Sequence, residues 1–188
     1  MTLDAEQIEN WNSGVGLVGL AGLDGSGKTT AAQTLIDAGW HRVKFAAPIK
    51  EMIRVIGMTD RHIEGDLKDI PCDILGGRTP RHAMQTLGTE WGRDLVYTDL
   101  WVDIARRKIT LAMAAGVNVV VDDVRFEDEA SMIRDLGGVI VGIKRGAKGA
   151  GSHASEAGVK FDMVCENNAS EAALRGWFSY VFLMAGYQ

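Results

Sequence analysis

The chain has 188 residues, of which 46% are hydrophobic and 24% charged, and its formal net charge is -5. This balance is typical of a soluble globular protein, and the length fits one domain with its own core. The acidic total argues against a protein that coats nucleic acid, because such proteins need a basic face for the phosphates. It leaves room for a local basic pocket that holds one nucleotide.

The cysteines and the N-terminus indicate a reducing, cytoplasmic location. Cys72 and Cys165 stand far apart, without His or Cys at ligand spacing, so we expect two reduced thiols. Residues 1–13 form a polar extension without the apolar stretch of a signal peptide. Because no apolar run reaches transmembrane length, we expect no membrane partner.

The first half of the chain alternates short apolar runs with helical patterns. Residues 15–21 predict a buried strand, and a helix over 28–38 follows it. Residues 42–45 predict a second strand, after which Pro48 begins a helix that includes Ile56. The polar segment 57–79 predicts a mobile loop with short helical turns, placed over the site. Pro80 then begins a helix through Leu87.

The second half repeats this alternation. We expect helices over residues 100–115 and 127–136, a C-terminal helix ending near Met184, and strands over residues 117–121, 139–143 and 161–165. Asn168 and Glu171 form a plausible capping box for the last helix. Residues 145–158 are rich in Gly, Ser and Lys and predict a mobile lid. The whole pattern predicts a single α/β domain of three layers, with a central parallel sheet of about five strands covered on both faces.

Residues 22–29 carry the strongest motif, because Gly22-Leu-Asp-Gly-Ser-Gly27-Lys28-Thr29 matches G-x-x-x-x-G-K-[ST] in full. The glycines let the backbone N–H groups and the start of the next helix surround an anion. Lys28 reaches the β- and γ-phosphates of a nucleoside triphosphate, and the Thr29 hydroxyl is a ligand for Mg²⁺. A chance glycine-rich turn is the alternative, which the preceding strand and following helix argue against. The residues expected to bind ATP are Gly22, Asp24, Gly25, Ser26, Gly27, Lys28, Thr29 and Thr30.

Three aspartates are candidates for the chemistry. Asp24 lies inside the loop, where it could meet an acceptor hydroxyl or be a solvated turn residue. Asp122 and Asp123 follow the strand at residues 117–121, and ligands of open α/β sheets bind at the carboxyl ends of strands. We expect the pair to divide its roles, one aspartate toward Mg²⁺, with Asp122 the candidate, and the other toward Arg125 or the acceptor. Capping of the following helix is the alternative.

A phosphoryl-transfer site also needs cations to neutralise the moving phosphoryl group. Arg78 and Arg81 flank a predicted helix start, where an acceptor phosphate is favoured. Arg145 begins the glycine-rich segment and is placed to act from a closing lid. A single arginine is more often a surface charge, so the interpretation depends on the group as a whole. The candidates near strand and helix ends are Arg78, Arg81, Arg93, Arg125, Lys144 and Arg145.

Taken in order, the motifs resemble the phage-type deoxynucleoside monophosphate kinases of the P-loop kinase class. The loop form from Asp24 to Thr29 is also similar to that of thymidylate kinases. The matching blocks span most of the chain: residues 22–30; Phe45-Ala-Ala-Pro-Ile-Lys50; Thr79-Pro-Arg-His-Ala-Met-Gln-Thr-Leu-Gly-Thr-Glu90 with Gly92-Arg93; Leu100-Trp101-Val102; Asp123-Val-Arg-Phe126 with Glu129-Ala130; and His153-Ala-Ser-Glu156 before Asn167-Asn168.

The resemblance implies transfer of the ATP γ-phosphate to a deoxynucleoside monophosphate (dNMP) with Mg²⁺, giving a dNDP and ADP. It implies catalytic roles for Lys28, Asp123, Arg125 and Arg145. It further implies a homodimer, as is common among such kinases, and, for a phage-encoded protein, the host cytoplasm. The acidic balance argues against a polymeric nucleic-acid partner. The residues expected to bind the acceptor are Asp24, Lys50, Arg78, Arg81, Gln85 and Arg93.

The chain departs from the family pattern at two places. Thr29 stands where many phage members have Asp, and Glu127-Asp128 stands where Pro-Asn is common. The second change bears on how the turn after Phe126 caps its helix and meets the acceptor. Three rival interpretations are another small-molecule kinase on the same scaffold, a non-catalytic ATP- or GTP-binding assembly factor, and a nucleic-acid-binding ATPase. The sequence lacks an Asn-Lys-x-Asp block for guanine, which argues against a GTPase.

Overall fold

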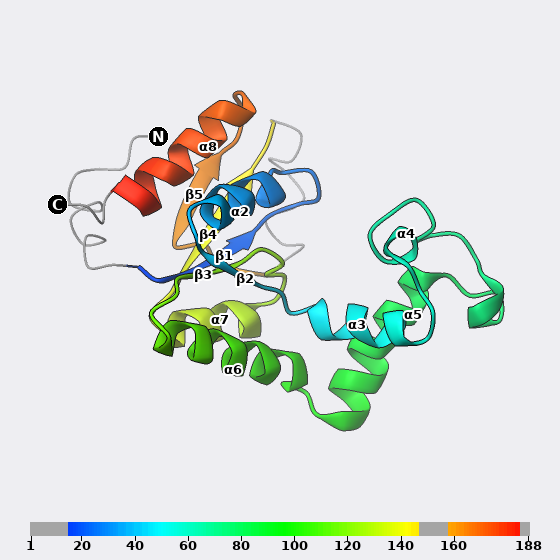
Figure 1. Cartoon of the computed structure of the whole chain (residues 1–188). Coiled ribbons are helices and arrows are strands. Elements are labelled where there is room, and N and C mark those ends of the chain that lie inside the picture. The colour runs from blue at the N-terminus through cyan, green and yellow to red at the C-terminus, as the bar shows by residue number, and fades with distance from the viewer. Residues whose placement is uncertain (1–14, 147–157, 185–188) are drawn as a thin grey trace. The chain divides into compact units, whose positions relative to one another are not determined.

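The computed structural model describes residues 15–146 and 158–184. Contacts divide the chain into two compact units, Met1–Lys44 with Arg106–Gln188, and Phe45–Ala105. The first contains the sheet, and the second is a set of short helices (Figure 1). That the whole chain works as one kinase domain stays a prediction.

The first unit is built on a parallel sheet of five strands in the order β2-β3-β1-β4-β5, as the sequence predicts. Strand β1 lies between β3 and β4, and its Val18 is opposite Val120 on β3 and Val139 on β4. The side chains of β1 and β3 are fully buried, because helices cover both faces of the sheet. The strands are β1 (Leu17–Ala21), β2 (His41–Val43), β3 (Val119–Val121), β4 (Val139–Lys144) and β5 (Met163–Glu166).

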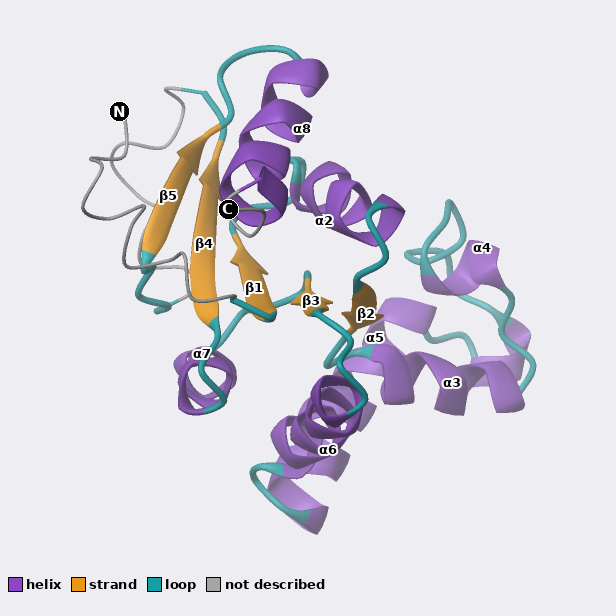
Figure 2. Cartoon of the chain, turned by 60° about the vertical axis from the view of Figure 1, so that its left-hand side comes forward, coloured by secondary structure: helices purple, strands orange, loops and turns teal. Residues whose placement is uncertain are grey.

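Helices α2 (Lys28–Asp37) and α8 (Glu171–Ser179) lie on one face of this sheet, and α7 (Glu127–Asp135) lies on the other (Figure 2). The three predicted layers are therefore confirmed. The core between the sheet and the α2–α8 pair is apolar and includes Leu35 and Phe178. A short π-helix, η3 (Tyr180–Met184), continues α8.

The predicted cap of the last helix is wrong. The N-cap is Ser170, whose hydroxyl accepts a hydrogen bond from the Ala173 amide at 3.2 Å. Asn168 instead accepts a hydrogen bond from the Gly146 amide at 2.7 Å. Asn and Ser are both good N-cap residues, so the helix could begin after either Asn168 or Ser170 as judged from the sequence. The side chain of Asn168 is instead used in the contact with the residues that follow β4.

The second unit packs around Ile53, Met58 and Ile63, which are buried together. The predicted helical turns in 57–79 are present as α4 and η1. The α6 helix starts in this unit and continues into the first. The elements are α3 (Ala47–Val55), α4 (Asp60–Ile63), η1 (Asp73–Leu75), α5 (Pro80–Thr86), η2 (Leu87–Val96) and α6 (Leu100–Ala114). No helix among the described residues combines the length and apolar character needed to cross a membrane.

The π-helix η2 is the one long element that the sequence analysis missed. Its two glycines, Gly88 and Gly92, look like helix breakers. Trp101 packs against this helix, and its indole N–H donates to the Gly88 carbonyl at 2.7 Å. A Cβ on Gly92 would lie 2.4 Å from Cζ2 of the same ring. Gly92 therefore leaves room for the buried Trp101 ring.

Candidate active site

The phosphate-binding motif forms the turn between β1 and α2, with strand before and helix after as predicted. Gly27 stands at the helix N-cap with φ of 110°, a conformation that favours glycine. A Cβ there would lie 2.6 Å from Nδ2 of Asn167, so space also requires glycine. No side chain caps α2 and its first turn holds no acidic residue. The first amides of the helix are thus available to an anion.

The Lys28 ammonium folds back over this loop. It donates hydrogen bonds to the carbonyl oxygens of Gly22, at 2.5 Å, and of Leu23, at 2.8 Å. The side chain is half-buried. Its N–H donors are therefore held next to the phosphate loop, where they can exchange the two carbonyls for phosphate oxygens.

Charges of both signs surround Lys28. Burial is the main influence and lowers the pKa of its ammonium, and the Arg125 charge acts in the same direction. Asp24 is the strongest opposing influence, and Asp122 adds to it. The predicted residues from the loop and from the end of β3 thus act on one ammonium group.

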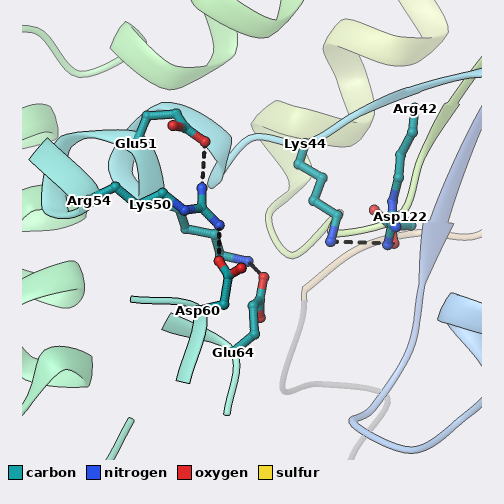
Figure 3. A network of polar contacts seen from close by, with 8 residues as sticks. All are labelled: Arg42, Lys44, Lys50, Glu51, Arg54, Asp60, Glu64 and Asp122. Carbon is teal, nitrogen blue, oxygen red and sulfur yellow. Dashed lines mark hydrogen bonds and ion pairs between the residues drawn. The ribbon is translucent and has the colours of Figure 1, made fainter. Parts of the chain in front are cut away.

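The Asp122 carboxylate is buried at the end of β3, with 5% of the residue exposed. Its Oδ2 contacts the Arg42 guanidinium and lies 3.9 Å from Nζ of Lys44 (Figure 3). Its Oδ1 has no hydrogen-bond partner among the described residues. Sequence reasoning missed Arg42 and Lys44. They are two residues apart at the end of β2, so both can lie on the same side of the sheet, and β2 pairs with β3, which Asp122 directly follows. That spacing could have indicated their role.

Glu129 organises the turn between β3 and α7. Its Oε2 accepts hydrogen bonds from the amides of Arg125, at 2.7 Å, and Phe126, at 3.2 Å. Phe126 is the N-cap of α7, so the alternative that Asp122 or Asp123 caps this helix is wrong. Burial raises the pKa of Glu129 to about 7, against the effect of the two amides. This residue carried no predicted role of its own.

Two residues near the end of the sheet brace the phosphate loop. Nδ2 of Asn167, which is 7% exposed, donates to the Ser26 carbonyl at 2.8 Å. Nη1 of Arg145 lies 3.4 Å from the Gly25 carbonyl, within hydrogen-bond distance. The predicted lid cation therefore stands beside the loop. The rest of the predicted lid, residues 147–157, lies outside the described residues.

A hollow opens next to these braces. It has a volume of about 460 Å³, and a smaller one of about 100 Å³ adjoins the start of α2. Arg145 and Asn167 line both, which joins the hollows to the phosphate loop. The larger is lined by Arg145, Gly146, Asn167, Asn168 and Ala169.

The remaining predicted acceptor residues belong to the second unit. Lys50 pairs with Glu64 (Figure 3), and Arg81 grips Asp69 through two hydrogen bonds, of 2.5 and 2.9 Å. Gln85 and Arg78 are exposed, and Arg93 is half-buried. Arg78 makes no ion pair with a described residue.

Known proteins match this chain along most of its length. The sequence model of the deoxynucleotide monophosphate kinase family matches residues 59–176. A protein of Acanthamoeba polyphaga mimivirus, provisionally named a deoxynucleotide monophosphate kinase, is 35% identical over 175 residues, 81% of this chain and 88% of its own length. The chain belongs to the deoxynucleotide monophosphate kinase family. An unliganded sugar kinase from Janibacter sp. HTCC2649 covers 90% of this kinase and 95% of its own chain, with 14% identity and a TM-score of 0.49.

Membership confirms the resemblance drawn from the motifs and the prediction of a dNMP kinase, hence a phosphotransferase. The first unit of this kinase brings together the phosphate loop, the strand-end aspartates, Arg125 and Arg145. The roles assigned to individual residues stay predictions. Among the described residues no cluster of three or more His, Cys, Asp or Glu could hold a metal by itself.

Proposed function

We propose that this kinase transfers the γ-phosphoryl group of ATP to a dNMP through the residues at the β1–α2 turn. An acceptor phosphate oxygen forms a bond to the γ-phosphorus, the bond from that phosphorus to the β–γ bridging oxygen breaks, and ADP leaves with that oxygen. The observation that carries the proposal is the uncapped start of α2 with the Lys28 ammonium at the loop mouth. Positioning and charge stabilisation dominate such a reaction.

Lys28 would exchange its two loop carbonyls for oxygens of the β- and γ-phosphates. The exchange keeps its donors satisfied, and phosphate oxygens are charged acceptors, which bind an ammonium more strongly than neutral carbonyls do. Arg125 acts on the same ammonium and would share the negative charge that shifts during transfer. Asp123, on the same turn, would orient Arg125 or the acceptor.

Mg²⁺ fits the group formed by Thr29 and Asp122. Thr29 is an exposed residue at the start of α2, and the buried Oδ1 of Asp122 has no partner among the described residues. A buried carboxylate oxygen without a partner is costly, and a hydrated cation would satisfy it. When bound, the ion would neutralise phosphate charge. Arg42 and Lys44 would hold Asp122 in place from the other oxygen.

The donor base would occupy the hollow beside the loop. Its lining offers a planar guanidinium from Arg145 and amide groups from Asn167 and Asn168, which can stack on and hydrogen-bond to a purine. The short distance from this lining to the loop carbonyls supports one continuous site for base and phosphates.

The acceptor nucleotide would bind Lys50, Arg78, Arg81, Gln85, Arg93 and Asp24. Arg81 binds Asp69 through an exposed two-point contact, and a guanidinium can form the same two-point contact with a phosphate in exchange. Arg78, exposed and without an ion pair to a described residue, can bind a phosphate without breaking one. The predicted homodimer, cytoplasmic location and absence of a nucleic-acid partner remain predictions.

ADP formation with ATP, Mg²⁺ and each dNMP or NMP in turn tests the proposal. We expect dNMP-dependent ADP, and Lys28→Ala should lower kcat by about a hundredfold or more. The matched control is Lys108→Ala, which removes an exposed lysine from α6. Near-normal turnover of Lys28→Ala would contradict the role of the loop.

A further inference from the structure

Glu129 is a buried carboxylate whose hydrogen bonds go to the backbone of a functional turn. It lies in the first turn of α7 with 3% exposure, and one of its oxygens accepts the amide hydrogens of two consecutive residues, Arg125 and Phe126. Two adjacent amides that point at one oxygen fix the local backbone. The direction of the Arg125 side chain depends on that backbone, because the Cα–Cβ bond is set by it.

Arg125 in turn acts on the phosphate site. Its side chain is exposed, and its charge acts on the Lys28 ammonium, which lies on the phosphate loop. The Glu129 carboxylate is therefore hydrogen-bonded to the backbone of the residue whose charge acts on Lys28.

We propose that Glu129 is a positioning residue for phosphoryl transfer, which holds the β3–α7 turn so that Arg125 faces the phosphate loop. The inference rests on the proposed function, because it assumes that Arg125 stabilises the transferred group. Glu129 itself does not touch the reacting atoms. Its contribution is the geometry of a turn whose side chains do.

The charge of Glu129 governs how firmly it holds the turn. The ionised carboxylate accepts the two amide hydrogens more strongly than the neutral acid does. Burial raises its pKa to about 7, and the charges that act on it are the carboxylates of Asp123, on the turn, and Asp128, on α7. The strands that pack against α7 are β1 and β4, and their buried residues, from Leu17 to Ala21 and from Ile140 to Ile143, carry no charge. Protonation near neutral pH therefore weakens the hold of Glu129 on the two amides while its carboxyl stays buried. The same protonation stabilises the fold against unfolding, because unfolding exposes the carboxyl to water.

The test compares kcat of the wild-type kinase and Glu129→Gln from pH 5.5 to 8.5. Glutamine has the same shape and keeps a neutral acceptor oxygen, so the two enzymes should agree at pH 5.5. At pH 8.5 the variant should be about tenfold slower, since one charged acceptor has become neutral. The ratio cancels the titration of the substrate phosphates, which is common to both enzymes. A ratio that is constant over this range would overturn the proposal.

The same comparison in an Arg125→Ala background separates positioning from a structural role. If Glu129 acts through Arg125, kcat of Arg125→Ala and kcat of the double variant Arg125→Ala/Glu129→Gln should be nearly equal at every pH. A pH-dependent loss that persists without Arg125 would overturn the assignment. Absence of dNMP-dependent turnover in the wild-type kinase would contradict the proposed function instead, which keeps the two failures distinct.

A measurement on the wild-type kinase needs no variant. Amide hydrogen exchange followed by NMR reports whether the Arg125 and Phe126 amides stay bonded to Glu129. Their protection factors, corrected for intrinsic exchange, should fall severalfold between pH 8 and pH 6, while the β1 amides stay constant. Unchanged protection at Arg125 and Phe126 would overturn the proposal even if Glu129→Gln fails to fold.

Discussion

The donor side of the candidate site and the second unit hold their polar side chains in different ways. In the first unit, Asn167, Glu129 and Lys28 reach backbone groups, and the first two are almost fully buried. In the second unit, Arg81 and Arg54 reach carboxylates on the surface. Backbone groups move only with the fold, whereas surface carboxylates can exchange partners with a ligand.

The difference has a physical basis in desolvation. A buried polar group that loses its partner costs the full penalty of leaving water, so its geometry is strongly enforced. An exposed ion pair is weakened by solvent and salt and by the entropy of two long side chains. We infer that the loop that holds the triphosphate is preorganised, while the second unit can adjust its cations to the acceptor. The following changes test that contrast, from the largest expected effect to the smallest.

Titration of Glu129 should produce the largest effect, because it adds a charge to a buried site. Its pKa is about 7 in the folded chain, above the ordinary value of 4.5, so the folded state binds the proton more tightly. The free energy of unfolding should therefore fall as pH rises from about 4.5 to 7, by about 3 kcal/mol at most. Urea unfolding at several pH values would measure it. Glu129→Gln should lack this slope; an equal slope in both would contradict the assignment.

Asn167→Asp should give the next largest effect. The carboxylate cannot donate to the Ser26 carbonyl and instead faces it, so the phosphate loop loses its buried brace. We expect KM for ATP to rise about tenfold or more, as loss of a buried hydrogen bond does, with KM for the dNMP little changed. Gln33→Ala, which removes an exposed hydrogen bond to Asp37 on α2, is the control and should leave KM for ATP unchanged. If both variants raised KM for ATP equally, the buried hydrogen bond from Asn167 to Ser26 would have no special role in ATP binding.

The phosphate loop and the sheet were predictable because their signals are local. A glycine pattern between an apolar run and a helix needs no knowledge of the rest of the chain, and the alternation of strands with helices indicates a parallel sheet. The partners of Asn167 and Glu129 are backbone groups, which leave no pattern in the sequence. Asn167 and Ser26 are also 141 residues apart in the chain.

The errors have the same origin in tertiary contacts. Asn168 was a reasonable cap by its residue type, but the end of β4 takes its side chain and Ser170 starts α8. The η2 helix was missed because Gly88 and Gly92 look like helix breakers, and the reason for Gly92 appears only with Trp101 packed against it. Local propensity is a weak guide where another element supplies the reason for a residue.

Arg81→Ala should have a moderate effect confined to the acceptor. The variant loses charge-assisted donors for the acceptor phosphate, so KM for the dNMP should rise about tenfold while KM for ATP stays constant. Arg61→Ala is a matched control, because Arg61 makes the same two-point contact with Asp66, at 3.0 and 2.6 Å, and has no predicted role. If KM for the dNMP rose in both variants, the cause would be the structural loss of a surface pair. If it did not rise in Arg81→Ala, Arg81 would not belong to the acceptor site.

The smallest effect should come from Asp60→Ala, which removes one partner of Arg54. This arginine also contacts Glu51 at 2.5 Å, and both carboxylates are well exposed, so solvent already screens the interaction. We expect thermal unfolding of the variant to be indistinguishable from wild type in low and high salt, with unchanged turnover. Asp122→Ala is the opposite case, since it leaves the Arg42 guanidinium without its buried partner. If Asp60→Ala were as destabilising as Asp122→Ala, the second unit would depend on its surface pairs as much as the first depends on its buried ones, and the adjustable acceptor side inferred above would be wrong.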